Sequence, residues 1–151
     1  MRKKNLKVPL IILVSILLLL FAAWNIAWIL LTNNRYEDFL KAVPKSKFGN
    51  HIIRKDDYVY GVNRPTYLSF TGNLSVNNSK EGKLLIIWPL MNGKYEYGIM
   101  IKKKDKVYQV HLNHDLTPIK KNSLIEQRIA EDLKLEVTEL LKRAKLVWDL
   151  E

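Results

Sequence analysis

The chain has 151 residues, with 25 basic side chains, 15 acidic ones and no cysteine. This length is typical of about one domain. Without cysteine there is no disulfide framework, zinc ribbon or thiol nucleophile. Residues 8–31 carry no charged side chain, and the rest of the chain carries all of them. That asymmetry excludes a plain soluble cytoplasmic domain.

We predict that residues 8–31 form a transmembrane anchor. At about 1.5 Å per residue this helix is roughly 36 Å long, enough to cross a hydrocarbon core of about 30 Å. The tail 1–7 holds four basic residues and no acidic one, so the positive-inside rule places it in the cytoplasm and residues 32–151 outside. The alternative is a cleaved signal peptide, whose apolar region is shorter and ends at a better small-x-small site. The sequence therefore indicates an uncleaved signal-anchor of a single-pass cell-membrane protein.

Several side chains near the outer end of this segment have predicted roles. Trp24 and Trp28 share one helix face and are placed to anchor the helix at the membrane interface. Ala23 and Ala27 form a small-xxx-small pair, and Asn25 is a polar group within the span, so the three are candidates for contact with another transmembrane helix. The simpler interpretation is that the alanines are ordinary span residues and that Asn25 reaches interfacial water.

Residues 32–57 are predicted to be a short helix followed by a connector. Tyr36, Phe39 and Leu40 have helical spacing, and Pro44 ends the helix. The stretch that follows is polar and basic and contains a Gly-Asn turn. We therefore expect no strand before residue 58.

Residues 58–151 are predicted to form an extracytoplasmic α+β domain. Four segments either alternate apolar and polar residues or are apolar throughout, as strands are. Short turns join them, including Asn92-Gly93, a strong hairpin signal. Gly72 occupies a position of the predicted strand where the alternation calls for an apolar side chain, which indicates a bulge or a close backbone approach. The segments predict a four-stranded antiparallel meander: Thr66–Val76, Leu84–Leu90, Tyr95–Ile101 and Val107–Asn113.

The last segment is predicted to be one long amphipathic helix. Ser123 and Glu126 have the spacing of a capping box, and apolar residues recur at intervals of three and four to about Trp148. Laid across the apolar face of the meander, this helix closes a two-layer core. The predicted fold class is therefore α+β, with one N-terminal transmembrane helix, the meander and the long C-terminal helix.

The histidines are the first candidates for metal binding or catalysis. His111 and His114 form an H-x-x-H pattern, and Asp115 or the distant His51 is a candidate third ligand. Residues three apart on a strand point to opposite faces, and zinc needs further ligands, so we favour solvent-facing histidines. Since no known catalytic motif is present, we predict neither an enzyme nor a cofactor nor a metal site. An envelope enzyme or metal-binding domain that uses these three residues stays the alternative.

Charge suggests a second alternative. Outside the tail the chain has 21 basic and 15 acidic side chains, a net charge of +6, with one cluster at Lys102–Lys106. Such a surface can bind an anionic lipid or an anionic wall polymer. Charged hairpin tips are common, however, and we favour that interpretation. We expect no nucleic-acid partner, because the domain is predicted to lie outside the cell and its aromatic residues occupy core positions.

One face of the predicted sheet is a candidate groove. If the long helix covers the other face, then Leu85, Ile87 and Met91 form an apolar strip rimmed by polar residues, as in a peptide or lipid groove. The short helix can cover the same strip with Tyr36 and Phe39, and this is the default expectation.

We therefore predict a membrane-anchored accessory or binding domain without enzymatic activity. Its predicted partners are membrane lipid and another membrane or envelope protein. The abundance of Lys, Ile and Asn suggests an A/T-rich bacterial genome. The ligand, the pathway and the oligomeric state are left open.

Overall fold

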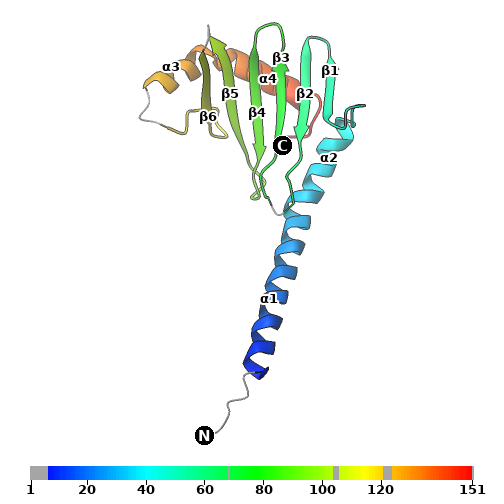
Figure 1. Cartoon of the computed structure of the whole chain (residues 1–151). Helices are drawn as coiled ribbons and strands as arrows, with labels where there is room; N and C mark the ends of the chain where they lie inside the picture. Colours follow the sequence, from blue (N-terminus) through cyan, green and yellow to red (C-terminus); the bar gives the residue numbers. More distant parts are fainter. Residues whose placement is uncertain (1–6, 68, 104–105, 121–123, 151) are drawn as a thin grey trace.

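The computed structural model describes residues 7–67, 69–103, 106–120 and 124–150. A long helix leads from the N-terminus into one sheet, and further helices lie behind that sheet (Figure 1). In chain order the elements are α1 (Lys7–Trp28), η1 (Ile29–Asn33), α2 (Asn34–Ala42), β1 (His51–Lys55), β2 (Tyr58–Asn63), β3 (Asn73–Asn78), β4 (Lys83–Pro89), β5 (Tyr95–Lys103), β6 (Lys106–Leu112), α3 (Leu124–Asp132) and α4 (Lys134–Lys145). The predicted α+β class is confirmed at this coarse level.

The first three elements form one continuous helix of 36 residues, Lys7–Ala42. The α1 segment is long and apolar enough to cross a membrane, and its apolar side chains are exposed. The short segment η1 is a π-helical turn between two α-helical parts. The predicted short helix is thus present as α2, but it continues the long helix and does not begin a separate element.

The sheet has six strands in the described residues, in the order β1-β2-β3-β4-β5-β6, with every neighbouring pair antiparallel. The predicted meander is therefore correct in topology and wrong in strand number. The two additional strands, β1 and β2, form a hairpin: β1 lies in the predicted connector, and β2 lies at the start of the predicted domain, where we had assigned no strand. Its turn contains Asp56 with a positive φ of 55°.

The first predicted strand, Thr66–Val76, is wrong over most of its length. The described residues between β2 and β3, 64–67 and 69–72, form a loop, which we call the loop 64–72, and β3 begins only at Asn73. Pro65 and Gly72 bound this loop, and both residues are unfavourable in a strand interior. The expected close approach at Gly72 is confirmed, because a Cβ there would lie 2.6 Å from the Asn63 carbonyl oxygen and 2.8 Å from the Tyr36 ring.

The C-terminal helix is divided into α3 and α4. The break lies at Leu133, whose φ of −109° and ψ of 8° leave the helical region. The helix α3 contacts β6, and α4 packs on β3 and β4. The predicted capping residue Ser123 lies outside the described residues, as does the side chain of Glu126.

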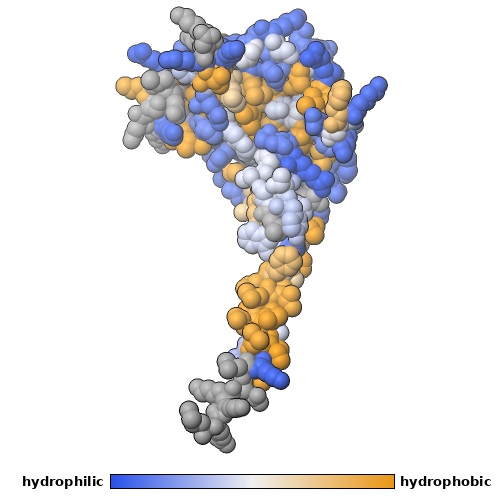
Figure 2. Space-filling model, in the orientation of Figure 1, coloured by the Kyte–Doolittle hydropathy of each residue, from blue (hydrophilic) through white to orange (hydrophobic). Residues whose placement is uncertain are grey.

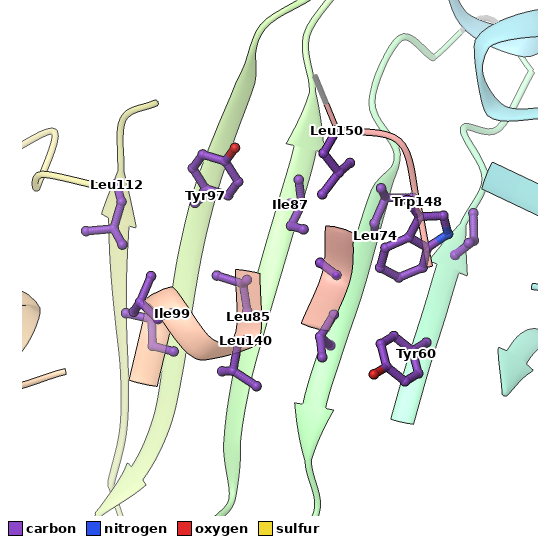
Figure 3. Close-up of a cluster of buried hydrophobic side chains, with 14 of the residues drawn as sticks. Tyr60, Leu74, Leu85, Ile87, Tyr97, Ile99, Leu112, Leu140, Trp148 and Leu150 are labelled. Atoms are coloured by element: carbon purple, nitrogen blue, oxygen red, sulfur yellow. The ribbon is translucent and has the colours of Figure 1, made fainter. Parts of the chain in front are cut away.

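One core fills the space between the sheet and these helices. Leu74, Leu85 and Ile99 project from adjacent strands, and Leu140 of α4 and Trp148 lie over them (Figure 3). Tyr36 and Phe39 of α2 belong to the same cluster. Removing this much apolar surface from water is the main stabilising contribution to the domain.

Candidate functional site

The two faces of the sheet have different surroundings. On one face the side chains lie beneath the helices, and Leu85 and Ile99 are fully buried. On the other face the alternate side chains are half-buried or exposed, and no helix stands in front of them in Figure 1. Figure 2 views this second side, which we call the open face, and shows apolar side chains gathered among polar ones. The register of the strands assigns to it Ile52, Arg54, Val59, Leu84, Ile86, Trp88, Met100, Gln109 and His111.

The predicted groove residues do not lie on the open face. Leu85 and Ile87 have no solvent exposure and belong to the core under the helices. Met91 is 59% exposed, but it lies beyond the end of β4. The side chains of strand β4 are apolar on both faces of the sheet. A register shift of one residue would exchange all of them between the two faces, so the sequence pattern does not decide which set is buried. The two β4 residues predicted to line the groove therefore belong to the set that faces the helices, and the other set of β4 side chains lies on the open face.

The short helix does not cover the open face either. Tyr36, Phe39 and Val43 are buried in the same core as Leu140 and Trp148. Burial raises the pKa of Tyr36 to about 12, so its phenol is neutral at physiological pH. Leu85 and Ile87 are thus covered and share a cluster with Tyr36 and Phe39, as the default expectation has it, but they lie on the same side of the sheet as the C-terminal helices and not on the opposite one.

An aromatic stack occupies the lower part of the open face. The Trp88 indole lies parallel to the His111 ring, with centroids 5.1 Å apart and an interplanar angle of 11°. The indole covers Gly98, where a Cβ would lie 2.6 Å from the ring. The side chains of Gln109 and His111 share a hydrogen bond of 2.9 Å. The open face thus combines flat aromatic surface with hydrogen-bonding groups, as binding surfaces do.

A shallow groove of about 460 Å³ lies on the same face across β1, β2 and β3. Ile52, Val59 and Leu84 supply apolar lining, and Ser75 and Asn77 supply polar groups. Mixed lining of this kind is typical of a surface that contacts a partner chain, whereas small-molecule pockets are deeper and more enclosed.

The residues of the metal-binding alternative, His111, His114 and Asp115, are not assembled into a site. His111 takes part in the stack on Trp88, and His114 pairs with Asp115 at 3.2 Å on the exposed surface. His51 Nδ1 lies 2.9 Å from the Val43 carbonyl oxygen. Within the described ranges, no group of three or more His, Cys, Asp or Glu side chains is placed to hold a metal ion.

A charged cluster connects the sheet to α4. The Lys83 ammonium lies 2.9 Å from Glu81 and 3.0 Å from Glu136. The hydrogen bond to Glu81 is the main cause that raises the pKa of Lys83, and the backbone N–H of Glu136 together with Lys83 lowers the pKa of the Glu136 carboxyl. Both groups are therefore held in their charged forms, which suits an ion pair and not a proton-transfer role.

The outer end of α1 contacts the loop 64–72. Trp24 packs edge-on against Phe70, with ring centroids 5.1 Å apart, and Trp28 packs against Tyr67 at 5.4 Å. The Trp28 Nε1–H donates to the Ser69 carbonyl oxygen at 2.8 Å. We call these contacts the helix–loop junction. The two tryptophans predicted as interface anchors thus also hold the domain.

Asn25 takes part in the same junction. Its amide donates to the Phe21 carbonyl oxygen at 2.7 Å and accepts a hydrogen bond from the Tyr67 hydroxyl. Ala23 is exposed and Ala27 is half-buried. The proposed contact of these residues with another helix stays a prediction, but the Asn25 amide already has partners within this chain.

A second contact joins α2 to the β4–β5 turn. The Arg35 guanidinium donates to the carbonyl oxygens of Leu90 and Gly93 and lies over the Tyr95 ring, 5.3 Å from its centroid.

The basic residues Lys102 and Lys106 lie at the ends of β5 and β6 that are far from α1 (Figure 1). The basic cluster is therefore remote from the membrane that α1 is predicted to cross.

No family model, no curated protein and no solved structure matches this chain. Its candidate site consequently rests on the geometry alone. Neither the helix–loop junction nor the set of residues on the open face was predicted from the sequence. The clustering of aromatic residues at 24–28 and 67–70 was the available signal for the junction.

Proposed function

We propose that this chain is a single-pass membrane protein whose sheet domain lies outside the cytoplasm and acts as a non-enzymatic binding module. Its partner is another membrane or envelope protein. The observation that carries the proposal is the open face, an apolar surface on a sheet whose described helices pack on the other side.

The long helix supports the anchor. Its apolar side chains are exposed, an arrangement that is costly in water and favourable in lipid. The preceding tail is basic, which favours retention of the N-terminus in the cytoplasm. The domain then projects from the outer surface of the membrane.

The orientation of the strands favours a partner beside the domain. The strands run roughly along the direction of α1 (Figure 1). If α1 crosses the bilayer, the open face therefore looks sideways over the membrane surface. Another protein anchored in the same membrane, or standing close to it, is in the right place to meet this face.

The charges of the open face indicate the chemistry of that partner. Ile86, Trp88 and Met100 supply apolar and aromatic surface, and Arg54 and Lys102 lie exposed at its margin. Glu96 is the one acidic side chain that the described strands place on this side. The matching partner presents apolar side chains flanked by acidic ones.

Site-specific photo-crosslinking in cells tests the proposal. A photoreactive amino acid is placed at Ile86 on the open face and, as a matched control, at Leu135, which is 84% exposed on α4. We expect the probe at position 86 to attach to a membrane or envelope protein at an apolar segment with acidic neighbours. The control position gives no such product.

A second variant tests whether the open face itself binds. With the probe moved to Met100, the substitution Ile86→Glu is expected to abolish the product, because it places a carboxylate in the apolar contact. Identical products from positions 86 and 135 would contradict the proposal. Attachment only to an anionic polymer, in a salt-sensitive manner, would favour the basic-surface alternative instead.

A further inference from the structure

The loop 64–72 lies unusually close to the segment that is predicted to span the membrane. Three of its residues, Tyr67, Ser69 and Phe70, contact α1 at Trp24, Asn25 and Trp28. All three helix residues fall inside the apolar segment 8–31. A loop of the outer domain therefore reaches back along the span and does not stop above it.

The depth of this contact follows from helix geometry. At about 1.5 Å per residue, Asn25 lies about 27 Å along the helix from Lys7, and the hydrocarbon core is about 30 Å thick. With Lys7 at the inner interface, Asn25 is just inside the outer boundary of the hydrocarbon. Tyr67, which bonds Asn25, and Phe70, which packs on Trp24, then lie where the outer lipid headgroups meet the hydrocarbon.

The chemistry of the loop suits that depth. Tyr and Trp side chains prefer the interface because they combine an apolar ring with a hydrogen-bonding group. Tyr67 is 61% exposed in the absence of lipid, although its ring is apolar. The Tyr67 hydroxyl also satisfies the side-chain oxygen of Asn25, which has no water to bind once it is below the headgroups.

We propose that the loop 64–72 is a lipid-contacting element that enters the outer headgroup region beside α1 and holds the domain upright on the bilayer. The inference rests on the proposed function, because it requires α1 to cross the membrane. The partner is the bilayer itself, recognised by aromatic side chains and not by the basic cluster at the remote end of the sheet. The loop and α1 together form a two-point attachment that stops the domain from tilting.

Depth-dependent fluorescence quenching tests this inference on the full-length chain. Because the chain has no cysteine, single cysteines carry an environment-sensitive fluorophore at one of three positions. Ser15→Cys reports on the middle of α1, Thr66→Cys on the loop, and Ser79→Cys on the exposed β3–β4 turn. Each labelled protein is reconstituted into phosphatidylcholine vesicles that contain nitroxide-labelled lipid, and retention of the fold is checked by circular dichroism.

The three positions separate the inference from the proposed function. We expect loss of fluorescence at position 15 with nitroxide deep in the acyl chain, loss at position 66 with nitroxide near the headgroup, and none at position 79. Quenching at 15 without quenching at 66 would overturn the lipid-contacting loop and leave the anchor intact. No quenching at 15 would overturn the anchor and the inference with it. Quenching at 79 as well would mean that the domain lies flat on the bilayer, which also overturns the inference.

Discussion

At the residue scale, Gly72 marks the point where the loop 64–72 returns to the sheet under α2. A Cβ at this position would lie within 3 Å of the Asn63 carbonyl oxygen, the Pro65 ring and the Tyr36 ring. Two of these neighbours are held by backbone or ring geometry and cannot rotate away. The position therefore accepts only glycine without a backbone shift.

Substitution of this glycine tests the packing directly. We expect Gly72→Ala to lower the free energy of unfolding by about 1–3 kcal/mol, the usual cost of overpacking a filled site. The measurement is urea unfolding of the full-length protein in detergent micelles, followed by tryptophan fluorescence. The exposed neighbour Thr71 supplies the control, since Thr71→Ala should change stability by less than about 0.5 kcal/mol. Equal effects at both positions would contradict the close approach.

The ion pair between Lys83 and Glu136 gives a pH dependence with a definite sign. The folded pKa of the Glu136 carboxyl is below its ordinary value of 4.5. Its stabilising contribution is therefore complete above pH 4.5 and is lost as the pH falls through the lower, folded value. We expect Glu136→Gln to destabilise the protein at pH 7 by at most about 1 kcal/mol, because both groups keep contact with solvent.

The check is the difference in unfolding free energy between wild type and Glu136→Gln at pH 7 and pH 3. The difference should shrink at pH 3, as the pH falls toward the lowered pKa of the folded carboxyl. A difference that stays constant across this range would show that the carboxylate charge contributes nothing.

The residues of the open face show how far a single sequence predicts which face of the sheet each side chain occupies. The alternation of Val110 and Leu112 with Gln109 and His111 was predicted correctly, because each strand face there has its own character. In β4 both sets of residues are apolar, so no periodic signal distinguishes Leu85 from Leu84. Only the register with β3 and β5 decides which set the helices cover.

At the scale of elements, the division of the C-terminal helix follows from the shape of the sheet. The two halves pack on different strands, α3 on β6 and α4 on β3 and β4. A twisted sheet turns its strands relative to one another, so one straight helix cannot follow both regions. The recurrence of apolar residues at intervals of three and four predicted the helical segments well. The break at Leu133 depends on the shape of the sheet, and this recurrence does not predict it.

The buried face of α4 is predicted to stabilise the whole domain. Leu140 is 3% exposed between the sheet and α4, whereas Leu135 of the same helix is 84% exposed. We expect Leu140→Ala to cost about 2–5 kcal/mol and Leu135→Ala less than about 0.5 kcal/mol. Urea unfolding of the two variants measures the difference. Similar losses in both would contradict the position of α4 over β3 and β4.

The missed hairpin β1–β2 also has a physical explanation. Strand β1 is an edge strand of five residues with the basic residues Arg54 and Lys55, and charged, short edge strands protect a sheet from unwanted pairing. Such a strand resembles a connector in sequence. The loop 64–72, in contrast, alternates like a strand in sequence, but its two aromatic residues, Tyr67 and Phe70, both contact α1 in the helix–loop junction.

At the scale of the whole molecule, the π-helical turn η1 aligns the membrane segment with the domain. Trp24, Trp28, Thr32 and Tyr36 recur every fourth residue, and all four contact the domain or are buried in it. In an α-helix of 3.6 residues per turn, residues four apart drift by about 40° per step. A π-helical turn holds more residues per turn and reverses part of this drift. The long helix can therefore keep one face against the domain from Trp24 to Tyr36.

Because of this continuity, the orientation of α1 in the membrane decides on which side of the membrane the sheet domain lies. Thiol labelling in intact cells tests it most directly, with single cysteines at Asn5 in the tail and at Ser79 in the exposed β3–β4 turn. A membrane-impermeant reagent is predicted to label Ser79→Cys in intact cells and Asn5→Cys only after the membrane is permeabilised. Labelling of Asn5→Cys but not Ser79→Cys in intact cells would place the sheet in the cytoplasm and contradict the proposed orientation.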